Sequence, residues 1–366
     1  MNHQLMIQVT SACNMNCPYC YVNQRPCDEI TVDDVRAQLP LAKKVSMLMD
    51  SNFSGGYAVA YFGGEPLLNY ETIIALHDQV FSTGEVNVVH EHVQTNALLL
   101  TEEKLVALNE RGVDVSYSFD GLWDPPESIA VHEQLLANGL LGADCAKIMI
   151  APQHAGDLME NYAYFVDRLG WTSPDFTFVR DDVWSDEATE MVCAQMHMLI
   201  DDIVARTLSD KNGRVFRVGF VDLALKDMVV GKKIGKRDFS CFAGRNGMVL
   251  THARQIYPCT RFYTNGECML ADANTGEVND DEIKRLGELL NTHVMTECMS
   301  CELRPYCNAG CAYTQYVHGD RQRMRPVANY CKIIKTCFRE AIRYANMLRD
   351  HTPFRRLVGD LTSPLF

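Results

Sequence analysis

The 366-residue chain is predicted to be an α/β protein, with an open or closed barrel followed by a small cysteine-rich domain. Two observations predict this fold class. Six apolar, strand-like runs alternate with helical patterns through the first half, which indicates a parallel sheet with helices outside it. From about Cys241 the helical periodicity fades, and cysteine, glycine and polar turn residues dominate through Cys337. Active sites of α/β folds lie at the carboxyl ends of the strands, so the residues that follow each strand are the first candidates for function.

The strand-like runs are Leu5–Thr10, Tyr57–Phe62, Val86–Gln94, Val113–Phe119, Lys147–Ile150 and Phe176–Val179. A helix is predicted over Thr31–Asp50, because Thr31 and an acidic first turn suit a helix N-terminus. Pro40 is expected to kink or divide it. Thr101–Arg111 is predicted to form a second helix that stops at Gly112. A last helix is predicted over about Ile333–Arg349, and the loop-rich module before it is expected to depend on metal because it cannot rely on a core.

Composition narrows the class of protein. Acidic residues outnumber basic ones by 47 to 34, a formal charge of -13, so neither nucleic acid nor an anionic membrane is an expected partner. No apolar run approaches the ~20 residues of a membrane span. The N-terminal segment lacks the pattern of a signal peptide, and we expect a cytoplasmic protein. The 15 cysteines are then best explained by metal ligation in a reducing compartment.

The first cysteine group directly follows the first predicted strand. Cys13, Cys17 and Cys20 can hold three irons of a [4Fe–4S] cluster and leave the fourth iron free for a substrate. The alternative is half of a zinc site, formed by Cys17 and Cys20. The spacing resembles the CxxxCxxC signature of the radical S-adenosylmethionine (SAM) superfamily, with Tyr19 in its usual aromatic place. This resemblance implies that the cluster chelates SAM and, when reduced, cleaves it to a 5′-deoxyadenosyl radical.

A glycine-rich turn follows the second strand. Its glycines let the backbone approach a ligand closely, and its glutamate can accept a hydrogen bond from an ammonium group. The turn consists of Gly63, Gly64, Glu65 and Pro66. It resembles the superfamily's GGEP motif, which binds the SAM amino group, although a simple tight turn is the alternative.

Polar residues also follow the third and fourth strands. Gln94 and Asn96 lie after the third, and Ser118 and Asp120 after the fourth. Both segments resemble stretches of the same subfamily, which implies that they face the cofactor or the substrate. The alternative is that they cap strand ends. No catalytic residue is assigned.

A second field of cysteines occupies the C-terminal part. Seven cysteines are too many for one zinc ion but close to what two four-thiolate clusters require. Their arrangement resembles the SPASM extension of radical SAM enzymes. The resemblance assigns to an outer cluster Cys298, Cys301, Cys307 and Cys331. It assigns to an inner cluster Cys241, Cys259 and Cys311.

Two positions depart from the SPASM pattern. Arg254 stands where the family usually has glycine, so this turn is expected to differ. Gly247 stands where sulfatase-maturing relatives have a further cysteine. The fourth ligand of the inner cluster is then Cys268, or the cluster keeps an open iron; both alternatives stay open. The remaining cysteines are expected to be buried free thiols: Cys27, Cys145, Cys193 and Cys337.

The resemblance covers nearly the whole chain. It implies a partial (β/α)6 TIM-like barrel over residues 1–220, a linker over 221–240, a SPASM domain over 241–337, and a C-terminal helix and tail over 338–366. The implied cofactors are SAM, one radical SAM [4Fe–4S] cluster and one or two auxiliary clusters, with two expected. A reductase such as flavodoxin or ferredoxin is the implied electron donor.

The first functional hypothesis is oxidation or cross-linking of a side chain in a ribosomally made peptide or a protein, begun by hydrogen abstraction. A small-molecule substrate is an alternative. Formylglycine formation is disfavoured, because Thr260 stands where sulfatase-maturing relatives have an aspartate base, and a hydroxyl is a poor base. From other classes, the alternatives are a non-catalytic iron–sulfur electron-transfer protein and a zinc-ribbon interaction protein. Near the site we expect Tyr21, Tyr61 and Tyr117, as an aromatic wall or as core.

Overall fold

The computed structural model describes residues 2–22, 28–181, 183–234, 241–290, 295–307 and 310–361, with the backbone only at 229–234 and 358–361. The chain forms two compact units. The first comprises Met1–Ser118 with Cys241–Asn291, and the second Phe119–Ser240 with Thr292–Phe366. Each unit therefore combines part of the βα region with part of the cysteine-rich region. The domain boundaries given above stay a prediction, and helix α7 (Gly219–Ile234) runs through most of the predicted linker.

The first unit is built on a parallel sheet. Its central strands are β1 (His3–Thr10), β2 (Gly56–Gly63), β3 (Asn87–Thr95) and β4 (Val113–Ser118), each paired in parallel with the next. Side chains on one face of β1 are fully buried, among them Leu5 and Ile7. The period-2 alternation of apolar residues thus sets which face of the sheet is covered. All four strands were predicted to within two residues at either end.

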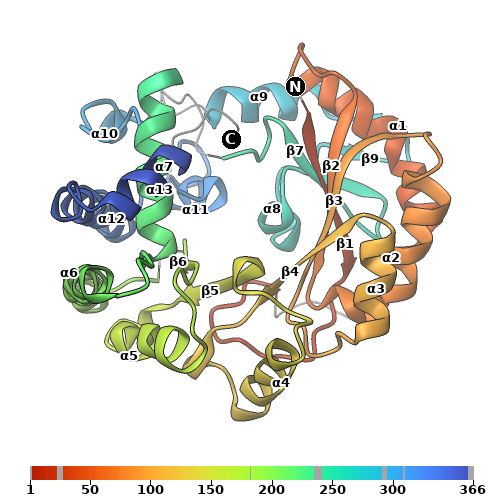
Figure 1. The fold of residues 1–366 in the computed structure, drawn as a ribbon. Helices are drawn as coiled ribbons and strands as arrows, with labels where there is room; N and C mark the ends of the chain where they lie inside the picture. Colours follow the sequence, from red (N-terminus) through yellow and green to blue (C-terminus); the bar gives the residue numbers. More distant parts are fainter. Residues whose placement is uncertain are drawn as a thin grey trace. The chain divides into compact units, whose positions relative to one another are not determined.

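Three helices lie along one face of the sheet (Figure 1): α1 (Val32–Met49), α2 (Tyr70–Leu76) and α3 (Glu102–Glu110). A 3-10 turn, η1 (Pro66–Asn69), precedes α2, and a π-helical turn, η2 (His77–Phe81), follows it.

The predicted helix starts are confirmed. The Thr31 hydroxyl accepts from the Asp34 N–H at 3.2 Å, and the Asp34 carboxylate accepts from the Thr31 N–H at 3.0 Å, which is a capping box. Thr101 caps α3 in the same manner by accepting from the Lys104 N–H. Pro40 does not divide α1, which is one continuous helix of 18 residues. The buried apolar face of α1 holds it on the sheet, and this packing outweighs the hydrogen bond lost at Pro40.

Residues 241–290 extend the same sheet beyond β1. Strand β7 (Gly247–Leu250) pairs in parallel with β1, and β8 (Gln255–Tyr257), β9 (Ala271–Asp272) and β10 (Glu277–Val278) follow in antiparallel order. The unit also contains α8 (Thr260–Thr264) and α9 (Asp280–Leu289). The expectation that this region lacks a core is wrong here, since several of its apolar side chains are fully buried: Met248, Val249, Leu250, Ile256 and Leu286. β7 adds to the open edge of an existing sheet and so shares the core already formed there.

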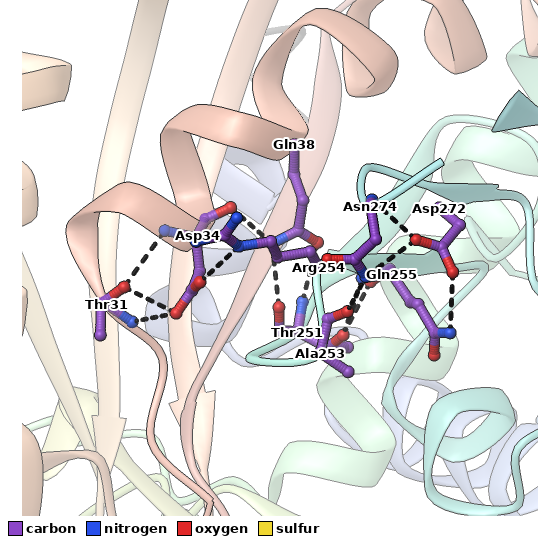
Figure 2. Close-up of polar contacts among 9 residues, drawn as sticks. All are labelled: Thr31, Asp34, Gln38, Thr251, Ala253, Arg254, Gln255, Asp272 and Asn274. Carbon is purple, nitrogen blue, oxygen red and sulfur yellow. Dashed lines mark hydrogen bonds and ion pairs between the residues drawn. The ribbon is translucent and has the colours of Figure 1, made fainter. Parts of the chain in front are cut away.

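The turn between β7 and β8 is tied to α1 by polar contacts (Figure 2). Arg254 has a left-handed backbone, with φ 58°, the conformation that glycine adopts most readily. Arg254 thus adopts a backbone conformation that glycine also tolerates, and the expectation of a different turn stays a prediction. Its Nε donates to the Asp34 carboxylate at 2.8 Å. The amide of Gln38 also donates to the Thr251 carbonyl and accepts from the Thr251 N–H, at 2.9 and 3.1 Å.

Substitution of Arg254 separates the stabilising contact with Asp34 from the strain of the left-handed backbone. Both Arg254→Ala and Arg254→Gly remove the contact with Asp34, but only alanine retains the left-handed strain. Relief of that strain exceeds the added freedom of glycine in the unfolded chain, so the glycine variant is expected to be more stable than the alanine variant by about 0.5–1 kcal/mol. Thermal unfolding of both variants measures this difference. Equal melting temperatures would mean that the strain only equals the entropic cost of glycine, and a more stable alanine variant would mean that the backbone at Arg254 carries little strain.

The second unit contains two parallel strands, β5 (Ala146–Ile150) and β6 (Phe176–Phe178), as predicted. Its longer helices are α4 (Pro126–Ala137), α5 (Leu158–Ala163), α6 (Asp186–Ser209), α7, α11 (Ala312–His318), α12 (Ala328–Met347) and α13 (Thr352–Leu361). Its short turns are η3 (Gly121–Trp123), η4 (Ala143–Cys145), η5 (Pro152–His154), η6 (Tyr164–Arg168) and α10 (Thr296–Met299). The predicted last helix corresponds to α12, which begins five residues earlier.

Helix α12 is fixed against α6 by contacts about one helical turn apart. The pairs are Lys332 with Glu190, Thr336 with Cys193, Glu340 with His197, and Arg343 with Asp201. Between these pairs, buried apolar residues of both helices pack together, including Met196 and Ile333. The position of α12, which carries Cys331, is thereby set by α6. Among the helices as far as the structure describes them, none is long and apolar enough to cross a bilayer.

Candidate functional site

The glycine-rich turn after β2 lies against the start of the first cysteine loop. The Gly64 N–H donates to the Thr10 carbonyl at 2.9 Å, and the Glu65 N–H donates to the Ala12 carbonyl at 2.8 Å. A Cβ atom at Gly63 would overlap the carbonyl oxygen of Thr10, and one at Gly64 would overlap that of Ala12. The two glycines therefore allow the backbone to approach the residues that lead into Cys13, and this contact sets the position of the loop.

Glu65 organises the end of the neighbouring strand. Its carboxylate accepts from the Leu67 N–H at 3.0 Å, from the Thr95 hydroxyl at 2.5 Å and from the Asn96 N–H at 2.7 Å. The side chain is 1% exposed, and burial raises the pKa of the carboxyl group, against the effect of these three hydrogen bonds. Glu65 thus joins the turn after β2 to the turn after β3. Its contact with an ammonium group stays a prediction.

Asn96 connects this turn to the cysteine loop. Its side-chain amide donates to the Asn14 side-chain oxygen at 2.7 Å and lies 4.0 Å from the Cys13 sulfur. Neither Asn14 nor Thr95 was found from the sequence, because short polar residues in turns are too common to single out. The three loops after β1, β2 and β3 are consequently held together by side chains that the strand ends bring to one edge.

Gln94 and Ser118 are joined by a chain of hydrogen bonds. The Ser116 hydroxyl donates to the Gln94 side-chain oxygen at 2.7 Å, and the Gln94 amide donates to the Ser118 hydroxyl at 3.1 Å. The direction of the chain leaves the Ser118 hydroxyl proton available to another acceptor. Asp120 belongs to the second unit, where it is buried and accepts from the Met149 N–H at 2.7 Å. This contact fits the alternative given above for Asp120, in which the side chain caps a strand end and does not face the cofactor.

Tyr19 is half-buried in the cysteine loop, and Pro66 is the first residue of η1, which Glu65 caps. Of the three tyrosines expected near the site, Tyr61 and Tyr117 are fully buried, and the Tyr61 hydroxyl donates to Glu91 at 2.6 Å. These two tyrosines are therefore core residues.

Tyr21 links the two groups of cysteines in the first unit. It directly follows Cys20, and its hydroxyl lies 2.8 Å from that of Thr260, which directly follows Cys259. The Arg261 guanidinium lies over the Tyr21 ring, 4.1 Å from its centroid. Burial raises the pKa of Tyr21, with Arg261 opposing this effect. At neutral pH, Tyr21 and Thr260 therefore form a pair of uncharged hydroxyl groups.

The four cysteines of the predicted outer cluster line one cavity in the second unit. The cavity contains about 550 Å³ of empty space, part of it open to solvent. Its lining residues are Cys298, Cys301, Leu303, Arg304, Cys307, Pro326, Tyr330, Cys331, Ile334 and Lys335. In the part of the chain that the structure describes, no three His, Cys, Asp or Glu side chains are placed to hold a single metal ion. A four-iron cluster has another requirement, one thiolate for each iron, and four thiols around one cavity fit it.

The predicted inner ligands are divided between the units, with Cys241 and Cys259 in the first and Cys311 in the second. Cys259 is buried and begins α8. A Cβ atom at Gly247 would overlap the ring of Phe242, so this ring occupies the space that a side chain at Gly247 would need.

Cys268 lies in the first unit with Cys241 and Cys259. Its backbone is left-handed, with φ 62°, and its sulfur lies 3.4 Å from an Arg285 guanidinium nitrogen. The ligand set of the inner cluster stays a prediction.

The cysteines outside the predicted clusters differ in burial. Cys337 is buried, as expected, and Cys193 is half-buried. The expectation is wrong for Cys145, which is exposed because it ends the short turn η4 at the surface before β5. Cys27 lies outside the described residues. Every cysteine that the structure describes is a free thiol.

The sequence of residues 7–133 matches the radical SAM superfamily. The chain carries a radical SAM domain. The matched segment contains Cys13, Cys17 and Cys20, the glycine-rich turn, and the ends of β3 and β4. The predicted resemblance to radical SAM enzymes is thereby confirmed over these residues.

Three relatives show how far the similarity extends. An uncharacterized protein of Archaeoglobus fulgidus is 24% identical over 352 residues, which cover 90% of this chain and 78% of that protein. The radical SAM cyclopropyl synthase TigE of Paramaledivibacter caminithermalis is 21% identical over 343 residues, which cover 84% of this chain and 67% of that protein. The uncharacterized protein MJ0907 of Methanocaldococcus jannaschii is 30% identical over 122 residues, so this chain spans 40% of the length of that protein.

Among solved structures, anSMEcpe with bound AdoMet has a TM-score of 0.67 at 17% identity, over 99% of this chain and 98% of that one. This likeness confirms the predicted fold class, an α/β fold of the radical SAM barrel type with a cysteine-rich C-terminal part and helices at its end.

Proposed function

We propose that this radical SAM enzyme oxidises or cross-links a side chain in a short ribosomally made peptide or a protein, beginning with hydrogen abstraction from carbon. SAM and a reduced cluster, when bound, supply the 5′-deoxyadenosyl radical for this step. The observation that carries the proposal is the shared edge at which the Cys13 loop, the turn at Gly64 and Glu65, and Asn96 are joined. A peptide substrate is supported by anSMEcpe, whose structure with AdoMet and the Kp18Cys peptide has a TM-score of 0.66 to this chain.

The residues of the first unit have distinct roles in this proposal. Cys13, Cys17 and Cys20 hold the SAM cluster, because thiolates bind iron and three of them leave one iron open. The residues of this unit around the bound SAM are Tyr19, Gly63, Gly64, Glu65, Pro66, Gln94, Asn96 and Ser118. A flavodoxin or ferredoxin supplies the electron.

Two auxiliary clusters complete the cofactor set. The outer one is held by Cys298, Cys301, Cys307 and Cys331, and the cavity that these residues share supports this assignment. The inner one is held by Cys241, Cys259 and Cys311. The Arg285 guanidinium beside the Cys268 sulfur is itself paired with the Glu282 carboxylate. Both alternatives for the fourth position, Cys268 and an open iron, therefore stay part of the proposal.

The environment of Thr260 argues against formylglycine formation. A general base must accept a proton near neutral pH, and the paired hydroxyls of Tyr21 and Thr260 are too weakly basic for this. The raised pKa of Tyr21 keeps its hydroxyl protonated. The proposed modification is therefore one in which a carboxylate base at position 260 is not required.

Production of 5′-deoxyadenosine tests the proposal. The protein is reconstituted with iron and sulfide without oxygen, given dithionite and SAM, and the product is quantified. The Cys13→Ala, Cys17→Ala, Cys20→Ala triple variant should form none, yet retain about eight irons if both auxiliary clusters are present. Intact clusters without product would overturn the proposal in favour of an electron-transfer protein.

The substrate class is tested separately with peptides encoded beside the gene. A change in peptide mass that requires SAM supports the peptide hypothesis. Product formation without any such change would point to a small-molecule substrate.

A further inference from the structure

The cavity lined by the four outer cysteines also contains two cationic side chains, Arg304 and Lys335. Arg304 is only 6% exposed, and a guanidinium keeps its positive charge at all physiological pH values. Burial of a cation is less costly where negative charge lies nearby, and four thiolates in the same cavity would supply such charge.

The chain connects both cations to the cysteines. Arg304 lies in the turn between Cys301 and Cys307, and its N–H donates to the Cys301 carbonyl at 3.1 Å. Lys335 follows Cys331 by four residues on α12, so the two side chains project from the same face of that helix. Each cation is thus within four residues of an outer cysteine in the sequence and lines the same cavity.

The lining of the cavity is positively charged. Arg304 and Lys335 are its cationic members, and the described residues that line it include no carboxylate. Glu297, which directly precedes Cys298, is half-exposed and lies 3.9 Å from Arg325. The cations therefore favour negative charge within the cavity.

The same attraction acts on a cluster. Four thiolates give a four-iron cluster a net negative charge, and reduction adds one more negative charge. A nearby cation stabilises the reduced form more than the oxidised form, and the effect per charge is larger for the buried Arg304 than for the exposed Lys335. We propose that Arg304 and Lys335 raise the reduction potential of the outer cluster, so that it accepts an electron more readily than the four thiolates alone would permit. This inference rests on the outer cluster of the proposed function.

Lys335 is the better residue to test, because it is exposed and its substitution leaves the core intact. The experiment uses the full chain with Cys13, Cys17 and Cys20 replaced by alanine, so that the SAM cluster gives no signal. Redox titration followed by electron paramagnetic resonance measures the midpoint potentials. The outer cluster is the one whose signal disappears when Cys331 is also replaced.

Lys335→Met should shift the outer midpoint to a more negative potential without changing iron content, and Lys335→Arg should restore it. Lys332→Met is the matched control: it removes the same charge from the same helix outside the cavity, together with an exposed ion pair to Glu190, and should leave the outer midpoint potential unchanged. An unchanged potential in Lys335→Met, or an equal shift in Lys332→Met, would overturn the inference. Loss of the outer cluster in Lys335→Met would also do so, since a tuning residue leaves the cluster in place. Absence of the outer cluster from the parent would instead refute the cluster assignment itself.

Discussion

Replacing Gly64 by alanine is expected to slow SAM cleavage by about 100-fold or more and leave the auxiliary clusters intact. The added Cβ would overlap the Ala12 carbonyl and lie 2.7 Å from the Ser11 carbonyl oxygen. Both are backbone atoms, so the turn has to move. That movement breaks the hydrogen bonds from Gly64 to Thr10 and from Glu65 to Ala12, which hold the start of the cysteine loop. A displacement of about 1 Å is enough to reduce the rate by about 100-fold.

The rate of 5′-deoxyadenosine formation measures this effect, and the iron content reports on the auxiliary clusters. Gly287→Ala is the matched control, because a Cβ at Gly287 would meet nothing within 4 Å and this glycine lies within helix α9. The control should keep full activity and gain about 0.5–1 kcal/mol of stability, since alanine is the better helix former. Activity of Gly64→Ala close to that of the parent would mean that this close approach has no part in positioning the site.

Local signals account for most of the fold that could be predicted. Thr31 and Thr101 predict helix starts, because the hydroxyl group of each accepts a hydrogen bond from the backbone N–H three residues later. Strands β1 to β6 are predictable because buried strands are rich in apolar residues. β8, β9 and β10 are two or three residues long, too short for a periodic pattern. Their burial depends on the free edge of β1, more than 230 residues earlier in the chain. Only the tertiary structure reveals such a dependence.

The candidate site also combines features that local sequence predicts with features that only the tertiary structure reveals. Cys13, Cys17 and Cys20 are recognisable because a loop of eight residues contains all three. The contact of Tyr21 with Thr260 joins residues 239 positions apart, so no spacing predicts it. Glu65 was predicted as a ligand for an ammonium group, yet its visible contacts are with Leu67, Thr95 and Asn96. A motif identifies a functional position, but which atoms it contacts is decided by neighbouring strands.

Loss of Cys331 is expected to lower the iron content by at least the iron that it ligates and by up to about four irons per chain. α12 holds this cysteine against the cavity through its contacts with α6, whereas Cys298, Cys301 and Cys307 all come from a single short segment. Burial raises the pKa of the Cys331 thiol to about 11, so at neutral pH iron has to displace its proton. The free energy of cluster binding then stabilises the second unit, and Cys331→Ala should unfold at a lower temperature than the parent.

Cys193→Ala provides the matched control. Cys193 is a half-buried cysteine of α6 that contacts the next turn of α12 through Thr336, but it does not line the cavity. Removing it disturbs the same helix pair without removing a proposed ligand, so iron content should not change. Iron analysis and thermal unfolding of both variants therefore separate ligation from packing. If both variants lost the same amount of iron, α12 would act only by packing; if Cys331→Ala lost none, the outer cluster would have to be held without α12.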